Sequence, residues 1–181
     1  MLFTKTEIEG AWLISPQPSL DERGFFARTF CVREFGERGL EDEFVQHSVS
    51  FNGRRGTLRG LHMQLPPFQE VKIVGCVKGA MYDVIVDLRP SSPTFLHWQS
   101  FELSAANRSQ LYIPRGVAHG FQTMVDATEV SYLISEYFTP AAAVGYPYDD
   151  PAFGIAWPRP ITAISERDRS WPAFARSRLS A

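Results

Sequence analysis

The stretch Val71-Lys-Ile-Val-Gly-Cys-Val-Lys-Gly-Ala-Met-Tyr-Asp-Val-Ile-Val-Asp-Leu88 contains two apolar runs, Val71–Val77 and Ala80–Leu88, separated by Gly79. Valine, isoleucine and aromatic residues are typical of the pleated, half-buried surface of a strand, and glycine marks the turn between strands. Alternation places Asp83 and Ile85 on one face of the second run and Val84 on the other. The stretch therefore predicts two neighbouring β-strands.

The same pattern repeats from Glu43 to Ile134, with glycine, proline and asparagine between the runs. Many short strands at this spacing indicate an all-β sandwich or barrel rather than β–α–β units, and a jelly roll fits best. One strand is expected to begin near Phe44. The others are expected at Leu58–Gln64, Val71–Val77, Ala80–Leu88, Leu96–Leu103, Leu111–Ile113, His119–Met124 and Thr128–Ile134.

The flanking segments contribute fewer elements. Trp12–Ser15 and the aromatic run Phe25–Phe30 predict two short strands, and Val32–Gly39 predicts a helix that stops at Gly39. Ser165 has the character of an N-cap for a further short helix near the C-terminal end. Because the 181 residues contain no low-complexity linker, we expect a single domain over residues 1–181.

The composition excludes several classes of protein. A hydrophobic fraction of 44% and a charged fraction of 21% are typical of a globular chain, and a net charge of −2 without blocks of like charge indicates neither a nucleic-acid nor a membrane partner. No run of about 18 apolar residues occurs, and charged residues near the N-terminus argue against a signal peptide. Cys31 and Cys76 lie far apart, without the spacing of a disulfide framework. We expect a soluble, cytoplasmic protein.

One polar cluster interrupts the β-rich sequence: Arg59-Gly-Leu-His-Met-Gln64, followed by Lys72. Simple alternation places His62 on one face of the strand and Arg59 on the other. If both side chains serve one site, Gly60 must mark a bend or bulge.

A metal site is one interpretation of this cluster. Its ligands would be His62, Glu70 and His119, the last of which follows the Pro114-Arg-Gly116 turn. Gln64 stands where the second imidazole of such a site belongs, and an amide oxygen is a poor ligand for a transition metal. We therefore expect no metal and keep a metal-dependent cupin oxygenase or isomerase only as an alternative.

Acid–base catalysis on an anionic substrate is the favoured interpretation. The unperturbed pKa of an imidazole is about 6.5, which makes His62 suitable as a general base at neutral pH. Either Asp83 or Asp168 can supply the carboxylate that orients the ring. Lys72 can stabilise an enolate oxygen, and Tyr132 can return a proton from the opposite side. Because Tyr132 lies on the apolar face of its strand, its hydroxyl needs a hydrogen-bond partner. The side chains available to bind a diphosphate are Arg23, Arg28, Arg59, His119 and Arg167.

Several motifs, all in the same order, resemble those of the dTDP-4-dehydrorhamnose 3,5-epimerase family, and the likeness runs from about Ser19 to Asp168. The resemblance implies a cupin-type jelly roll, a homodimer, no metal or other cofactor, and a nucleoside-diphospho-4-keto-6-deoxysugar substrate, most simply a dTDP-linked one. The matching motifs are Asp21-Glu-Arg-Gly-Phe-Phe26, Gly56-Thr-Leu-Arg-Gly-Leu-His-Met-Gln64, Lys72, Asp83-Val-Ile-Val-Asp-Leu-Arg89, Ser92-Pro-Thr-Phe95, Tyr112-Ile-Pro114, Ala118-His-Gly-Phe121 and Ile155-Ala-Trp-Pro158.

The resemblance also implies a role for individual residues. His62 matches the base, Tyr132 the acid, and Lys72 the residue at the sugar C4 oxygen. Between the two candidate carboxylates, the resemblance favours Asp168 over Asp83. The predicted substrate contacts are Arg23, Arg28, Gln46, Ser48, Arg59, His119, Tyr137 and Arg167.

The sequence departs from the family pattern at the periphery of the predicted site. Arg28 and Ala143 replace glutamates, Ser48 replaces an asparagine, Phe138 replaces a second aromatic hydroxyl, and Arg167 replaces a lysine. These positions bear on the choice of nucleotide and of C3 or C5, so the alternatives are a mono-epimerase, an enzyme for a CDP- or GDP-linked sugar, and a non-catalytic sugar-nucleotide binding module.

Overall fold

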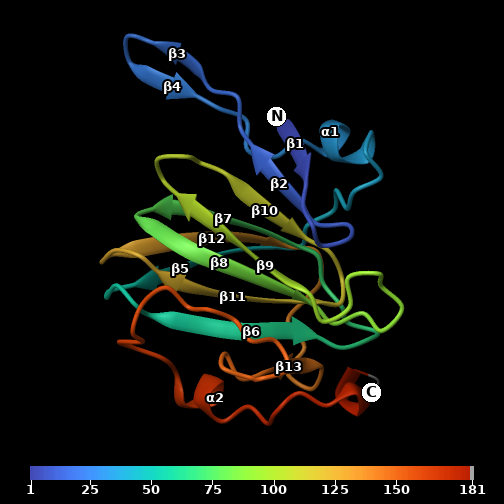
Figure 1. The fold of residues 1–181 in the computed structure, drawn as a ribbon. Coiled ribbons are helices and arrows are strands. Elements are labelled where there is room, and N and C mark those ends of the chain that lie inside the picture. The colour runs from blue at the N-terminus through green and yellow to red at the C-terminus, as the bar shows by residue number, and fades with distance from the viewer. Residues whose placement is uncertain (180–181) are drawn as a thin grey trace.

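Two antiparallel β-sheets face each other and enclose the core in the computed structural model, which describes residues 1–179 (Figure 1). The larger sheet has six strands in the order β1-β2-β10-β7-β12-β5, and the smaller has five in the order β13-β6-β11-β8-β9. This arrangement is a cupin-type jelly roll, which confirms the predicted all-β fold. The strands are β1 (Leu2–Lys5), β2 (Trp12–Ser15), β5 (Gln46–Asn52), β6 (Leu58–Gln64), β7 (Lys72–Lys78), β8 (Ala80–Asp87), β9 (Trp98–Ser104), β10 (Gln110–Ile113), β11 (Val117–Thr123), β12 (Thr128–Ile134) and β13 (Ala143–Gly145).

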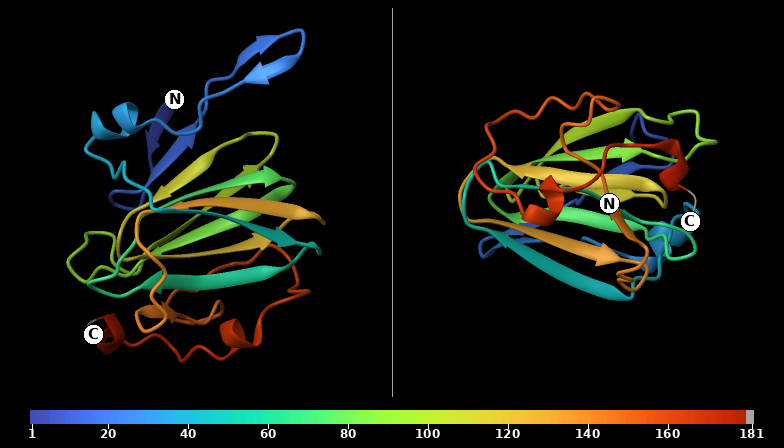
Figure 2. Two further views of the ribbon diagram at one scale, coloured as in Figure 1. Left: turned by 180° about the vertical axis from the view of Figure 1, so that it is seen from behind. Right: turned by 90° about the horizontal axis from the view of Figure 1, so that it is seen from below.

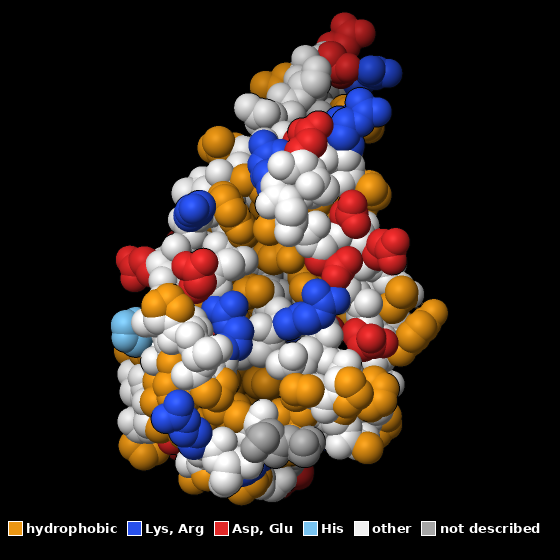
Figure 3. All heavy atoms as spheres, turned by 90° about the vertical axis from the view of Figure 1, so that its right-hand side faces the viewer, with side chains coloured by type: hydrophobic (Ala, Val, Ile, Leu, Met, Phe, Trp, Pro, Cys, Tyr) orange, Lys and Arg blue, Asp and Glu red, His pale blue; other side chains and the backbone are white. Residues whose placement is uncertain are grey.

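A two-stranded hairpin formed by β3 (Ser19–Asp21) and β4 (Gly24–Phe26) stands apart from both sheets (Figure 1). The prediction of one strand over Phe25–Phe30 was therefore wrong, because the strand ends at Phe26. We call this hairpin, residues 19–26, the arm. It extends away from the body of the protein and carries acidic and basic side chains at its tip (Figure 3).

The helices are short. α1 (Val32–Gly36) is shorter than the predicted helix, and the chain turns at Gly39, whose φ of +65° is a conformation that glycine adopts without strain. α2 (Glu166–Arg169) begins where Ser165 was expected to cap it, since the Ser165 hydroxyl accepts a hydrogen bond from the Asp168 N–H at 3.1 Å. A 3₁₀ turn, η1 (Arg176–Leu179), follows. None of the helices in residues 1–179 combines the length and the apolar character that a membrane span requires.

The five-stranded sheet is covered on both faces. Ile85 points into the core between the sheets, whereas its neighbours Val84 and Val86 pack under the C-terminal segment against Tyr146 and Phe153. Figure 2 shows this segment crossing the outer face of the sheet. All three β8 side chains are fully buried, and burial of each contributes about 1.5–3 kcal/mol relative to exposure. This C-terminal segment matters for function because it contains α2 and places that helix against β6.

Candidate active site

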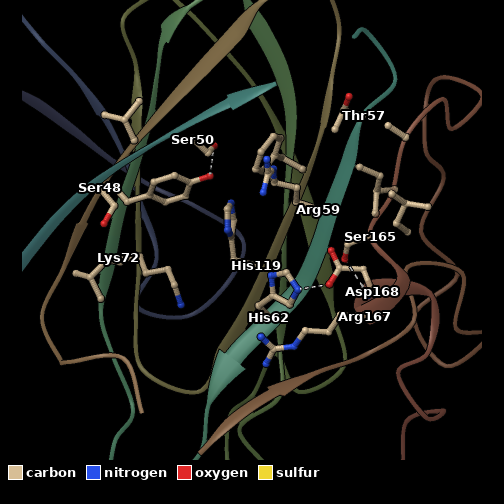
Figure 4. Close-up of a pocket in the computed structure, with 17 residues that line it drawn as sticks. Ser48, Ser50, Thr57, Arg59, His62, Lys72, His119, Ser165, Arg167 and Asp168 are labelled. Carbon is tan, nitrogen blue, oxygen red and sulfur yellow. Dashed lines mark hydrogen bonds and ion pairs between the residues drawn. The ribbon is translucent and has the colours of Figure 1, made fainter. Parts of the chain in front are cut away.

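A cavity of about 650 Å³ lies between the two sheets and brings together most of the predicted site residues (Figure 4). The six-stranded sheet contributes Ser48, Lys72 and Tyr132 to its wall. The five-stranded sheet contributes Arg59, His62 and His119, and α2 contributes Arg167 and Asp168. Residues far apart in the sequence therefore converge because the sheets face each other.

His62 and Asp168 form a hydrogen-bonded pair, with 2.6 Å between His62 Nε2 and Asp168 Oδ1 (Figure 4). An ionised carboxylate only accepts, so the proton lies on Nε2 and Nδ1 is left as the acceptor of the neutral ring. Asp168 also accepts from the Gly60 N–H and the Trp171 indole N–H, each at 3.3 Å. Asp83, the other candidate partner, instead accepts from His119 Nε2 at 2.7 Å.

The Asp168 carboxyl is buried, and burial by itself would raise its pKa. The hydrogen bond and charge of His62, with the donors of Gly60 and Trp171, outweigh burial and hold the pKa below its ordinary value of 3.8. Asp168 is therefore ionised at neutral pH, as a residue that orients an imidazole must be.

This lowered pKa predicts a pH-dependent contribution to stability. A carboxyl whose pKa is depressed on folding stabilises the protein above its unfolded pKa, and that contribution is lost as the pH falls through the folded value. Asp168→Asn should therefore lower the free energy of unfolding by about 1–3 kcal/mol at pH 6, with a smaller deficit at pH 3. Urea denaturation measures both values, and Asp149→Asn, at an exposed carboxylate, is the control. An Asp168→Asn deficit that stays constant from pH 6 to pH 3 would contradict this account.

A bulge at Gly60 turns Arg59 and His62 toward the same cavity. Between the pairs His119–His62 and Phe121–Arg59, β6 advances three residues while β11 advances two, so alternation in β6 is shifted by one. Gly60 has a φ of +125°, and an added Cβ would lie 2.5 Å from the Gly120 Cα. The strands approach each other too closely here for any larger residue. The prediction that Gly60 marks a bend or bulge is confirmed.

Arg59 and Tyr132 are each held by residues of β5. Asn52 Oδ1 accepts from Arg59 Nε at 2.8 Å, and the Ser50 hydroxyl lies 3.1 Å from that of Tyr132. Burial raises the pKa of Tyr132 to about 12, while the hydrogen bond of Ser50 and the charge of Arg59 act in the opposite direction. The expectation of a partner for the Tyr132 hydroxyl is confirmed. Neither Ser50 nor Asn52 was predicted, although alternation along β5 places both on the same face as Ser48.

Lys72 forms an ion pair with Glu70, and both side chains are largely buried. Glu70 also accepts from the Gln64 N–H at 3.1 Å, while the Gln64 side chain bonds to the backbone of Phe68, Tyr137 and Thr139. Two ligands of the metal interpretation therefore have other partners, since Glu70 pairs with Lys72 and His119 pairs with Asp83. No three His, Cys, Asp or Glu side chains within residues 1–179 are grouped so that they could hold a metal ion.

Four predicted substrate contacts lie outside this cavity. Gln46 lines a neighbouring cavity of about 180 Å³ that shares His62, Lys72 and Arg167 with the first and also borders Phe138 and Ala143. Tyr137 is 62% exposed. Arg28 lies 3.5 Å from Glu34 of α1, and Arg23 is at the tip of the arm, paired with Asp21. Their roles stay predictions.

Comparison with known proteins agrees with the motifs and the geometry. A chain from Methanothermobacter thermautotrophicus named dTDP-4-dehydrorhamnose 3,5-epimerase is 44% identical over 172 residues, covering 93% of this chain and 92% of its own. The crystal structure of dTDP-4-dehydrorhamnose 3,5-epimerase from Bacillus anthracis with bound TDP and PPi superimposes with a TM-score of 0.93 at 39% identity, covering 96% and 99% of the two chains. A 3′-monoepimerase from Streptomyces bikiniensis in complex with dTDP-quinovose gives 0.86 at 34% identity, covering 93% and 85%. The sequence profile of the dTDP-4-dehydrorhamnose 3,5-epimerase family matches residues 5–176, and the chain belongs to this family.

Proposed function

We propose that this protein epimerises a dTDP-linked 4-keto-6-deoxyhexose, at C3, C5 or both. The observation that carries the proposal is the placement of His62 and Tyr132 on opposite sheets across one cavity that Lys72 also lines. Epimerisation requires a proton to leave one face of a carbon and another to arrive on the opposite face. Two proton-transfer groups on facing walls meet this requirement.

The 4-keto group makes the reaction possible. The C3–H and C5–H bonds flank the ketone, so removal of either proton by His62 leaves an enolate whose charge lies on the C4 oxygen. Lys72 contributes a positive charge for that oxygen, and Asp168 stabilises the imidazolium formed on His62. Tyr132 then delivers a proton to the other face, which inverts the carbon. No redox step is involved, so the proposal needs no cofactor.

The nucleotide part of the substrate would be held by Arg59, His119 and Arg167, which line the cavity, with the two guanidinium groups supplying donors for a diphosphate. The bound TDP and dTDP-quinovose of the two related structures support a thymidine nucleotide.

A mono-epimerase is the second candidate. The similarity to a 3′-monoepimerase favours it, as does Phe138, which lacks the hydroxyl expected at that position.

Incubation with dTDP-4-keto-6-deoxyglucose tests the proposal directly. The expected products, identified by NMR, are sugars inverted at C3, at C5 or at both carbons, and their distribution distinguishes the double epimerase from the mono-epimerase. Recovery of unchanged dTDP sugar together with turnover of a CDP- or GDP-linked sugar would reassign the nucleotide. Binding without turnover of any of the three would indicate a binding module instead.

We also propose a homodimer in which the arm of one copy reaches the cavity of the other. The Arg23 side chain is 84% exposed, and Leu20 and Phe26 on the same arm are 76% and 77% exposed. An arm with such apolar side chains is costly to leave in water, and a second copy would cover them. The symmetry of a dimer would also bring each Arg23 to a partner's diphosphate, which explains a predicted substrate contact so far from its own cavity.

Complementation tests this arrangement. Arg23→Ala should lower kcat/KM by about 10–100-fold, because it removes a cation from the diphosphate site. Mixed dimers of Arg23→Ala with an inactive His62→Ala chain should regain one intact site, which amounts to about a quarter of wild-type activity in a statistical mixture. Arg54→Ala, at an exposed arginine outside the arm, is the control for the Arg23 substitution. A mixture no more active than the sum of its parts would exclude exchange of the arm.

We propose the cytoplasm as the working compartment. Cys31 and Cys76 are both free thiols, which suits a reducing environment. Cys31 is only partly buried, so an oxidising compartment would leave its thiol open to oxidation.

A further inference from the structure

A chain of hydrogen bonds connects Arg59 to Tyr132 through two residues of β5. Arg59 Nε donates to Asn52 Oδ1 at 2.8 Å, Asn52 Nδ2 lies 3.5 Å from the Ser50 hydroxyl, and that hydroxyl lies 3.1 Å from the hydroxyl of Tyr132. Asn52 is 2% exposed. Both ends of the chain, Arg59 and Tyr132, line the cavity together with Ser50, and only Asn52 between them is fully buried.

The direction of these hydrogen bonds follows from groups that can only donate or can only accept. A guanidinium only donates, so the oxygen of the Asn52 amide must face Arg59. A backbone carbonyl only accepts, and the Thr128 carbonyl lies 3.2 Å from Asn52 Nδ2, so the amide nitrogen must lie on the other side. Both constraints give the same orientation of the Asn52 side chain. The group that Asn52 presents to Ser50 is consequently an N–H donor.

The Ser50 hydroxyl accepts from Asn52, which leaves its own proton available for the Tyr132 oxygen, its other partner within residues 1–179. A phenolate oxygen only accepts, so once Tyr132 has lost its proton, Ser50 is the donor in this pair. In that state every donor in the chain points from Arg59 toward Tyr132.

We propose that Ser50 and Asn52 are positioning residues that direct the proton of Tyr132 toward the substrate and stabilise the phenolate left when that proton is transferred. The inference rests on the proposed function. In the step itself, the Tyr132 O–H bond breaks, the enolate electron pair and the proton form the new C–H bond, and the negative charge passes from the sugar to the phenolate. Solvent then restores the proton to Tyr132, and His62 releases its own proton to solvent.

The surroundings of Tyr132 explain why such support is needed. The ring packs against the core between the sheets, and burial disfavours its charged form. Among residues 1–179, Ser50 is the only hydrogen-bond partner recorded for the hydroxyl. Without the Ser50 donor, the phenolate would form in a buried position with no hydrogen bond from the protein.

The test compares three variants with the wild type on dTDP-4-keto-6-deoxyglucose in D₂O. Ser50→Ala removes the donor, Ser50→Thr keeps a hydroxyl, and Ser131→Ala is the matched control. Ser131 precedes Tyr132 in the same strand and bonds to His47 on the opposite face of the sheet. The readouts are kcat and KM for inversion and the rate of deuterium incorporation without inversion.

Ser50→Ala should lower kcat for inversion by about 10–100-fold, leave KM within about twofold, and leave deuterium incorporation without inversion nearly unchanged. Ser50→Thr should recover most of the activity, and Ser131→Ala should resemble the wild type. Equal losses of incorporation and inversion in Ser50→Ala, a large rise in KM, or wild-type kinetics would each overturn the positioning role. Failure of the wild type to act on the sugar would overturn the proposed function instead, so the two failures are distinguishable.

Discussion

Replacing His62 with alanine should abolish both deuterium exchange and epimerisation, with a fall in kcat of at least about 10³-fold. In the proposed mechanism His62 takes the first proton, so every later step depends on it. Its side chain is 42% exposed and is held by Asp168, whereas His119, the other imidazole that lines the cavity, has a side chain only 7% exposed. NMR of the sugar in D₂O measures exchange and inversion in one experiment.

His97→Ala is the matched control for this substitution, because His97 is an exposed histidine outside the cavity. It should retain wild-type exchange and inversion. Far-UV circular dichroism and thermal unfolding establish that the His62→Ala protein is folded. A folded His62→Ala protein that still exchanges at an appreciable rate would remove His62 from the role of base.

Replacing Tyr132 with phenylalanine should separate the two halves of the reaction. The variant keeps His62, Asp168 and Lys72, so proton removal and its reversal on the same face should continue. It lacks the group that we propose delivers a proton to the opposite face, and net inversion should fall by about 10²–10⁴-fold. The measured quantity is the ratio of deuterium incorporation to inversion, which should rise sharply in Tyr132→Phe.

Tyr82→Phe is the control for loss of a tyrosine hydroxyl. Tyr82 packs against Trp157 on the outer face of the five-stranded sheet, with its ring centroid 6.3 Å from that of Trp157, and should tolerate the change. If Tyr132→Phe lost exchange and inversion to the same extent, His62 and Tyr132 would not divide the reaction as base and acid.

The central strands were predictable because their signal is local. Apolar runs punctuated by glycine and proline identified β6, β7, β8 and β12 to within a residue or two. The short strands β1, β3 and β13 were missed, since none of them contains three consecutive apolar residues, as the equally short and correctly predicted β2 does. The aromatic run after Gly24 suggested a longer strand than β4, because aromatic residues favour strands even where, as at Phe30, they pack against a helix.

The candidate site was predictable where the sequence of a single strand determined which way its side chains point. The bulge at Gly60 follows from the need to turn Arg59 and His62 to one side, and the inward position of Tyr132 follows from strand alternation. The choice between Asp83 and Asp168 was not accessible from spacing, because Asp168 reaches His62 only through the C-terminal segment that covers the five-stranded sheet. The pairing of Asn52 with Arg59 depends in the same way on contacts between neighbouring strands.

The most direct test of the central claim is the isotope content of the inverted carbons in product made by the wild type in D₂O. In this account His62 removes a proton from one face of the sugar and Tyr132 delivers a different proton to the other face. The hydrogen that His62 removes is therefore never returned by Tyr132. We predict deuterium at every inverted carbon and none at C2, which does not flank the ketone. An inverted carbon that keeps its original hydrogen would contradict the account.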